Sequence, residues 1–139
     1  NICNGLFTHF KREEDSTMKS GKLDEELFRM SAIVDCLRKN SLVLFNESFS
    51  STNEREGSEI SRQITLSLLQ KQIKIFTVTH LYQFADDLYN QYCSTYLFLR
   101  ATRNQDGNRN LKIQPGAPLL TAFGEDLYKI IFNKFETQN

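Results

Sequence analysis

The sequence is poor in residues that build metal sites and disulfide frameworks. It has no tryptophan, two prolines, two histidines and three widely spaced cysteines. Cys3, Cys36 and Cys93 form no CxxC pair, and only His9 and His80 could join them, so a metal site built on thiols is not expected. Reduced thiols in a cytoplasmic protein are the expectation. No apolar run is long enough to cross a bilayer, and no signal peptide is recognisable.

The chain also lacks an excess of charge of either sign. Lysine plus arginine and aspartate plus glutamate number 17 each among 139 residues. This balance gives no electrostatic argument for nucleic acid or membrane binding by the segment itself. With 40% hydrophobic and 24% charged residues, the composition is that of a globular domain with a real core. Because the sequence starts at Asn1 without methionine, we expect an excerpt from a longer protein.

What the sequence does contain is an alternation of strand and helix patterns. The apolar run SLVLFNE (41–47) has no polar face, which predicts a strand buried on both sides in a parallel sheet. A second apolar strand is predicted at 73–79. Between them, Asn53 and Glu56 have the spacing of a capping box, and a helix ends near Lys71. Strand, helix and strand form a βαβ unit with a right-handed crossover and a parallel pair.

The flanking segments predict further elements of the same α/β class. An amphipathic helix from 22 to 39 has acidic residues in its first turn and basic residues in its last. The other expected elements are a short strand at 3–10, a polar loop at 11–21, a short helix at 81–89, a strand at 91–103, a turn at 104–110, a returning strand at 111–114 stopped by Pro115, and a final amphipathic helix through 127–135.

The candidate chemistry lies where the two central strands end. Asn46 and Glu47 follow one strand and Thr79 and His80 the other, and the carboxyl ends of parallel strands are where such sheets bind ligands. Glu47 could orient and partly deprotonate a water that attacks a terminal phosphate, and His80 could contact the same phosphate. The plainer alternative is that Asn46 and Glu47 open a turn and that His80 is a hydrogen-bonded structural residue.

Motifs of other enzyme classes are missing. No GxxxxGK[ST] loop is present, because Ser20, Gly21 and Lys22 are followed by Leu23 instead of a hydroxyl. A phosphate loop would therefore have to lie before Asn1. A serine hydrolase is poorly supported without GxSxG, and a thiol enzyme is poorly supported because the helix and strand patterns include the cysteines at 36 and 93.

Taken together, these pieces resemble the carboxyl-terminal half of the ATPase domain of the MutS family, the ABC-type ATPases of DNA mismatch repair. LFTHFKREED (6–15) resembles the family's IFTRIGA-DD segment, and residues 21–37 occupy the place of its signature helix. SLVLFNESFSSTNEREG (41–57) is similar to SLVLxDExxxGTSTxDG, and FTVTH (76–80) resembles FATH. Residues 115–124 are similar to the segment before the family's last ATPase helix.

The resemblance implies roles for six residues. Asn46 stands where the Walker B aspartate holds magnesium through water, Glu47 where the catalytic carboxylate polarises the attacking water, and His80 on the switch histidine that senses the γ-phosphate. Thr52 falls in the D-loop, which faces the partner subunit. Ser20 and Gly21 fall at the signature loop, which reaches the nucleotide bound by the partner subunit. Asparagine in place of the Walker B aspartate and glycine in place of the signature serine depart from the family and suggest a divergent branch.

The fold class that follows is a partial P-loop NTPase (ABC-type) sheet, with a parallel βαβ core, flanking helices and a carboxyl-terminal β-hairpin plus helix. Residues 1–139 would be the carboxyl-terminal part of the domain, inactive alone, with the Walker A part upstream. The resemblance implies ATP and Mg²⁺, a homodimer through this domain, DNA binding by upstream domains, and no membrane partner. One alternative is a MutS-like module that uses ATP for assembly without hydrolysis, outside mismatch repair. Another is an unrelated α/β domain.

Overall fold

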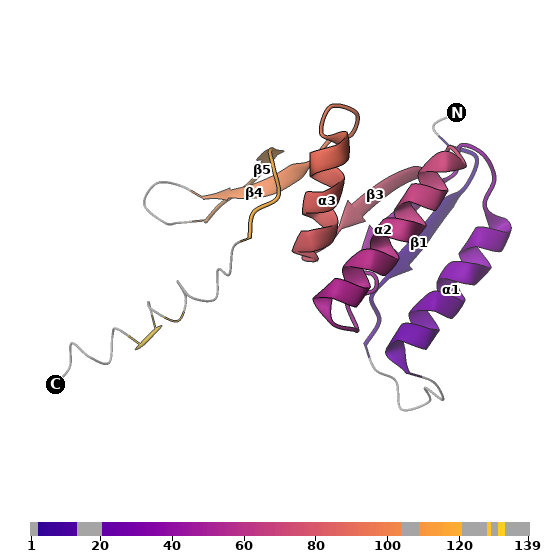
Figure 1. Ribbon diagram of the computed structural model, residues 1–139, viewed down its shortest axis with the longest axis horizontal. Coiled ribbons are helices and arrows are strands. Elements are labelled where there is room, and N and C mark those ends of the chain that lie inside the picture. Colours follow the sequence, from indigo (N-terminus) through magenta and orange to yellow (C-terminus); the bar gives the residue numbers. More distant parts are fainter. Residues whose placement is uncertain (1–2, 14–20, 104–108, 121–127, 129–130, 133–139) are drawn as a thin grey trace.

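The computed structural model describes residues 3–13, 21–103, 109–120, 128 and 131–132, and it contains a three-stranded sheet alternating with helices (Figure 1). A separate two-stranded hairpin follows. In chain order the elements are β1 (Leu6–Phe10), α1 (Lys22–Cys36), β2 (Leu42–Asn46), α2 (Glu54–Gln70), β3 (Lys74–Val78), α3 (Tyr82–Tyr92), β4 (Leu99–Arg103) and β5 (Arg109–Pro115). The predicted α/β class is confirmed.

The sheet has the strand order β1-β2-β3, and both neighbouring pairs are parallel. Across it, Phe10, Asn46 and Val78 share one register row at the carboxyl ends of the three strands. The predicted parallel βαβ unit is therefore confirmed, and a second unit, β1-α1-β2, precedes it. All three strands deliver their last residues to one edge.

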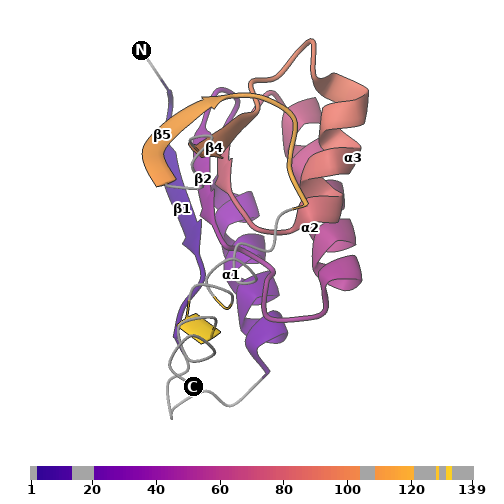
Figure 2. The same ribbon diagram turned by 90° about the vertical axis from the view of Figure 1, so that its left-hand side faces the viewer.

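Helices α1 and α2 cover the same face of the sheet (Figures 1 and 2). Val43 and Phe45 of the central strand are buried beneath them, because alternate residues of a strand point to opposite faces. Met30 of α1 and Leu68 of α2 close the core from above. Partly buried side chains that pack against this core are Phe7, Leu23, Ile33, Leu37, Ile60, Ile64 and Ile75.

Local sequence explains where α2 begins and how the chain turns after α1 and α2. The side chain of Asn53 caps α2, since its Oδ1 accepts the Glu56 N–H at 3.0 Å, as the capping-box spacing predicts. Asn40 and Gln72 have φ values of 65° and 58° in the tight connections from helix to strand. A left-handed residue at that point reverses the chain so that β2 and β3 can enter the sheet.

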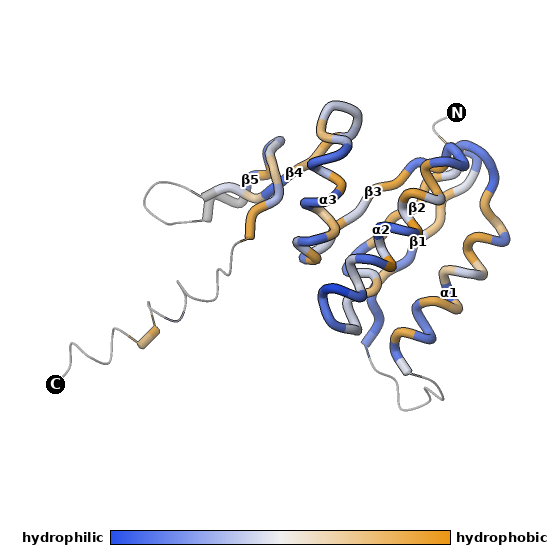
Figure 3. Tube along the Cα trace, in the orientation of Figure 1, coloured by the Kyte–Doolittle hydropathy of each residue, from blue (hydrophilic) through white to orange (hydrophobic). Residues whose placement is uncertain are grey.

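The opposite face of the sheet is only partly covered by the described residues. Leu42 and Leu44 are half-buried there, whereas Phe76 is 56% exposed and Val78 49% exposed. The sequence predicts a central strand that is buried on both sides. Its apolar side chains are fully buried on the side of the helices and only half-buried on the other side. Hydrophilic residues gather at the start of α2 (Figure 3).

The carboxyl-terminal part differs from the sequence prediction. The strand expected at 91–103 begins only at Leu99, because α3 continues to Tyr92 and backbone hydrogen bonds to the Tyr92 carbonyl form a turn after it. The hairpin itself is confirmed, but β5 begins at Arg109, two residues earlier than predicted, and includes Pro115 as its last residue. The turn at 104–110 and the final helix lie largely outside the described residues. Among the described helices, none combines the length and apolar character needed to span a bilayer.

Candidate functional site

Two of the predicted site residues meet at the carboxyl edge of the sheet. The Glu47 N–H donates to the Val78 carbonyl oxygen at 2.9 Å, which extends the β2–β3 ladder by one residue. The Glu47 carboxylate then forms a hydrogen bond with Nδ1 of His80. Their side chains are 30% and 65% exposed, so both are accessible to a ligand from solvent. The predicted convergence of the two strand ends is confirmed.

The loop that carries Glu47, residues 47–51, has an unusual backbone. Glu47 has a φ of 54° and Phe49 a φ of 59°, in the left-handed region that non-glycine residues rarely adopt. The Ser50 hydroxyl donates to the Glu47 carbonyl oxygen at 2.6 Å and closes the turn. Such conformations cost of order 1–3 kcal/mol each and persist only where surrounding contacts determine them. The contacts that hold this loop come from α1 and β1.

Glu26 of α1 is buried beneath the loop. The residue is 3% exposed, and its Oε1 accepts the Phe49 N–H at 2.8 Å. Its Oε2 accepts the hydroxyl hydrogen of Ser51. One carboxylate therefore fixes two residues of the loop, and hydrogen bonds to a charged group are among the stronger ones in proteins.

His9 of β1 supports the same loop from the sheet. Its ring is fully buried and stacks on Phe49, with 5.0 Å between ring centroids and an interplanar angle of 21°. Nε2 lies 2.9 Å from the Glu26 carbonyl oxygen, and since a carbonyl can only accept, Nε2 carries a hydrogen. The Ser48 hydroxyl donates to the His9 carbonyl oxygen at 2.5 Å, and its Oγ lies 2.7 Å from His9 Nδ1.

The pKa of His9 is lowered, chiefly by desolvation of the buried ring, and the Arg29 charge lowers it further. The hydrogen bond to the Glu26 carbonyl opposes this shift. The imidazole is accordingly neutral at neutral pH, with its proton on Nε2. In that state His9 is a structural tie between β1, α1 and the loop.

The remaining predicted residues are distributed around this edge. Asn46 ends β2 with an exposed side chain, next to Glu47. Gly21 is the N-cap residue of α1, and Thr52 contacts the Glu56 carboxylate in the turn before α2. Ser20 lies outside the described residues. The structure therefore joins Glu47 to His80, with Asn46 adjacent in the chain, and places Gly21 and Thr52 at the starts of two helices.

The side chains at the carboxyl edge of the sheet can be compared with the ligands that magnesium requires. Within the described ranges, no group of three or more His, Cys, Asp and Glu side chains could hold a metal ion. Magnesium in phosphate-transfer sites is commonly bound by one or two protein oxygens together with water and substrate phosphates. The Asn46 amide oxygen and the Glu47 carboxylate are oxygen donors of that kind, so their chemistry fits the ion.

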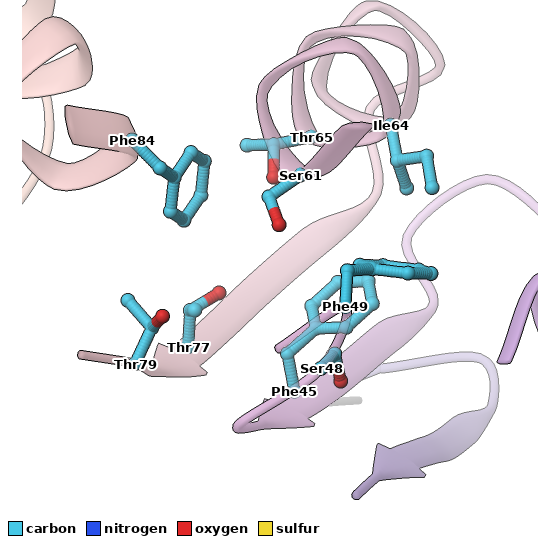
Figure 4. Close-up of a pocket in the computed structure, with 9 residues that line it drawn as sticks. All are labelled: Phe45, Ser48, Phe49, Ser61, Ile64, Thr65, Thr77, Thr79 and Phe84. Carbon is cyan, nitrogen blue, oxygen red and sulfur yellow. The ribbon is translucent and has the colours of Figure 1, made fainter. Parts of the chain in front are cut away.

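Two small pockets adjoin the site. One lies between β3, α2 and α3, where the hydroxyls of Ser61 and Thr77 point into the space beside Phe84 (Figure 4). The other lies at the start of α1 and is lined by Lys11, Arg12, Lys22, Glu25, Glu26 and Ser51. This second pocket brings basic and acidic side chains together at the amino terminus of a helix.

Glu26, His9 and Ser48 were not predicted as parts of a site. A weak signal for Glu26 is its place between Leu23 and Met30, at the spacing of the buried stripe of α1. The sequence pattern favours Leu27 for that stripe, yet Leu27 is 39% exposed and Glu26 is buried. Nothing in the sequence around His9 predicts that its ring is enclosed.

Comparison of the chain with models of known protein families gives no match, and comparison with curated protein sequences gives no significant one. The likeness to the MutS family therefore rests on the motifs quoted above.

Proposed function

We propose that this chain is the carboxyl-terminal part of an ATPase and dimerisation domain like that of MutS proteins, which couples ATP binding and hydrolysis to a DNA clamp. The observation that supports this most is the Glu47–His80 hydrogen bond at the carboxyl edge of two parallel strands. That edge is where ligands bind in open α/β sheets. A carboxylate and an imidazole side by side there suit the handling of a water and a phosphate.

Each residue has a defined task in this proposal. Glu47 would orient a water in line with the terminal phosphate and accept its proton as the bond to the leaving diphosphate breaks. His80, on the neighbouring strand, would donate to an oxygen of that phosphate. Asn46 would hold Mg²⁺ through water, and the ion when bound would neutralise phosphate charge. The hydrogen bond between Glu47 and His80 keeps both groups at one place before a ligand arrives.

The dimeric part of the proposal involves the starts of two helices. Gly21 lies at the amino terminus of α1, beside the pocket where basic side chains meet Glu25 and Glu26, and a helix amino terminus suits an anion. Thr52 is half-buried in the turn before α2. In a homodimer these positions would face the nucleotide of the partner subunit and the partner itself. Contacts with DNA would belong to upstream domains of a longer cytoplasmic protein.

A second candidate function follows from Asn46. An amide in place of a carboxylate removes one negative charge near the metal, which weakens magnesium binding and slows hydrolysis. ATP would then act mainly to hold two subunits together, in a role other than mismatch repair. This candidate shares the nucleotide site with the first and differs from it in turnover and in biological role.

The test is ATP binding and hydrolysis by the intact protein at increasing magnesium. Wild type is compared with Glu47→Gln and Asn46→Asp, and Glu59→Gln on the exposed side of α2 serves as the matched control. Hydrolysis by wild type that Glu47→Gln abolishes, with binding retained, supports the ATPase. Binding without turnover, restored by Asn46→Asp, supports the assembly module. Absence of ATP binding in wild type refutes both.

A further inference from the structure

We infer that Glu26 is a positioning residue: its buried carboxylate ties α1 to the loop of residues 47–51 and holds Glu47 in its working conformation. This inference rests on the proposed function for its kinetic readout, while its structural readout is independent of ATP. It concerns a contact between two elements that are separated by more than twenty residues in sequence.

The argument begins with the strained backbone. Glu47 and Phe49 both adopt left-handed conformations, and no glycine is present at either position to relieve the cost. The loop would relax toward ordinary conformations if its contacts were removed. Any relaxation around Glu47 changes the direction in which its carboxylate points, because its backbone is the pivot between β2 and the loop.

The contacts that oppose relaxation converge on Glu26. Its carboxylate accepts the Phe49 N–H and the Ser51 hydroxyl, and its own carbonyl oxygen accepts from His9. The aromatic ring of Phe49 is held against His9, whose Nδ1 meets Ser48. Thus the residues on both sides of Phe49 are tied to the same residue of α1, directly or through His9.

Burial makes this tie hard to replace. Glu26 is 3% exposed and Phe49 is 1% exposed, so water cannot readily take over as the hydrogen-bond partner of the Phe49 amide. The Glu47 side chain, in contrast, points to solvent and meets His80. The buried side of the loop therefore fixes the backbone, and the exposed side presents the reacting group.

The chemistry of the carboxylate suggests a pair of variants. Glu26→Gln keeps an oxygen that can accept the Phe49 N–H, and its amide N–H can donate to Ser51 Oγ, so the tie is retained. Glu26→Ala removes both acceptors. A milder variant, Ser51→Ala, removes one of the two hydrogen bonds at a partly exposed position and should fold even if Glu26→Ala does not.

The experiment measures amide hydrogen exchange and ATP hydrolysis on the intact protein. We expect Glu26→Ala to speed exchange of the Phe49 amide at least about tenfold while the β2 amides stay protected, and Ser51→Ala to do so by a smaller factor. The kcat should fall about 10- to 100-fold in Glu26→Ala with KM little changed, as expected for a displaced catalytic group. Glu26→Gln should restore both, and Glu59→Ala, which removes a surface ion pair, should alter neither.

The outcomes separate this inference from the proposed function. If Phe49 exchange is unchanged in Glu26→Ala, or in Ser51→Ala should Glu26→Ala fail to fold, the tie is refuted whether or not ATP is hydrolysed. If exchange rises but kcat is unaffected in a protein that hydrolyses ATP, the positioning role is refuted. A wild-type protein without turnover overturns the kinetic part together with the ATPase proposal, and the exchange result alone then decides the tie.

Discussion

Replacing Gly57 with alanine tests how closely α2 approaches the loop. Gly57 lies in the first turns of α2 and is buried against the Phe49 carbonyl oxygen. A Cβ built on Gly57 would come about half an ångström inside the 3.0 Å that real Cβ atoms keep from other heavy atoms. The obstructing atom is backbone, so a side-chain rotation cannot clear it.

Two effects of opposite sign determine how much Gly57→Ala changes the free energy of unfolding. Alanine in place of a helical glycine stabilises the helix by about 1 kcal/mol. Overpacking against a fixed backbone costs about 1–3 kcal/mol, and the upper end applies because the Phe49 amide is itself held by Glu26. We therefore expect a net loss of about 2 kcal/mol, which for a chain of this size lowers Tm by about 6–8 °C.

Thermal and urea unfolding of the chain, followed by circular dichroism, gives the measurement. Gly21→Ala is the matched control, since the nearest atom to its added Cβ is Asp24 Oδ2 at 4.0 Å, and we expect a change of about 0.5 kcal/mol at this N-cap position. A Gly57→Ala chain as stable as wild type, or more stable, would show that the stabilisation of the helix by alanine equals or exceeds the cost of overpacking. The loop would then not be pinned where the structure places it.

Three further predictions concern stability. Burial lowers the pKa of His9 in the folded chain below 6.5, so as pH falls the unfolded chain takes up this proton before the folded chain does. The contribution of His9 to the free energy of unfolding is therefore full above about pH 6.5. It is lost as pH falls through the lowered pKa of the folded state. Urea unfolding across this range should show that loss, and less of it in His9→Gln. Asn53→Ala removes the cap of α2 and should cost about 1 kcal/mol in urea unfolding, with far-ultraviolet dichroism reporting the helix. Phe45→Ala in the core should cost about 3–5 kcal/mol, whereas Phe28→Ala, at an exposed position, should change stability by about 0.5 kcal/mol or less, both from denaturant midpoints.

Periodicity and connection rules predict most of the sheet. Apolar runs identify β2 and β3, and the Asn53–Glu56 spacing identifies the start of α2. The meeting of Glu47 and His80 could also be predicted, because parallel strands joined by a helix must end at the same edge. Each of these inferences can be made without knowing which distant residues are in contact.

The buried ties of the loop could not be predicted in the same way. Glu26 looks like a solvent-facing residue of an acidic first turn, and only its partners Phe49 and Ser51, more than twenty residues away, explain its burial. The late start of β4, in contrast, has a local cause. Local hydrogen bonds to the Tyr92 carbonyl outweigh the alternating pattern until Leu99 can pair with Pro115.

The face of the sheet that the described residues cover only in part connects the fold to the proposed site. Parallel sheets occur almost only with both faces covered, yet Leu6, Phe10, Phe76 and Val78 stand exposed on the face opposite α1 and α2. By alternation along β2, Asn46 belongs to this face, whereas Phe45 belongs to the helix face. A layer that covers the apolar side chains would therefore end beside Asn46. If the chain is part of an ATPase domain as proposed, Asn46 and Glu47 would meet the phosphates at the carboxyl ends of the strands, beside the edge of that layer.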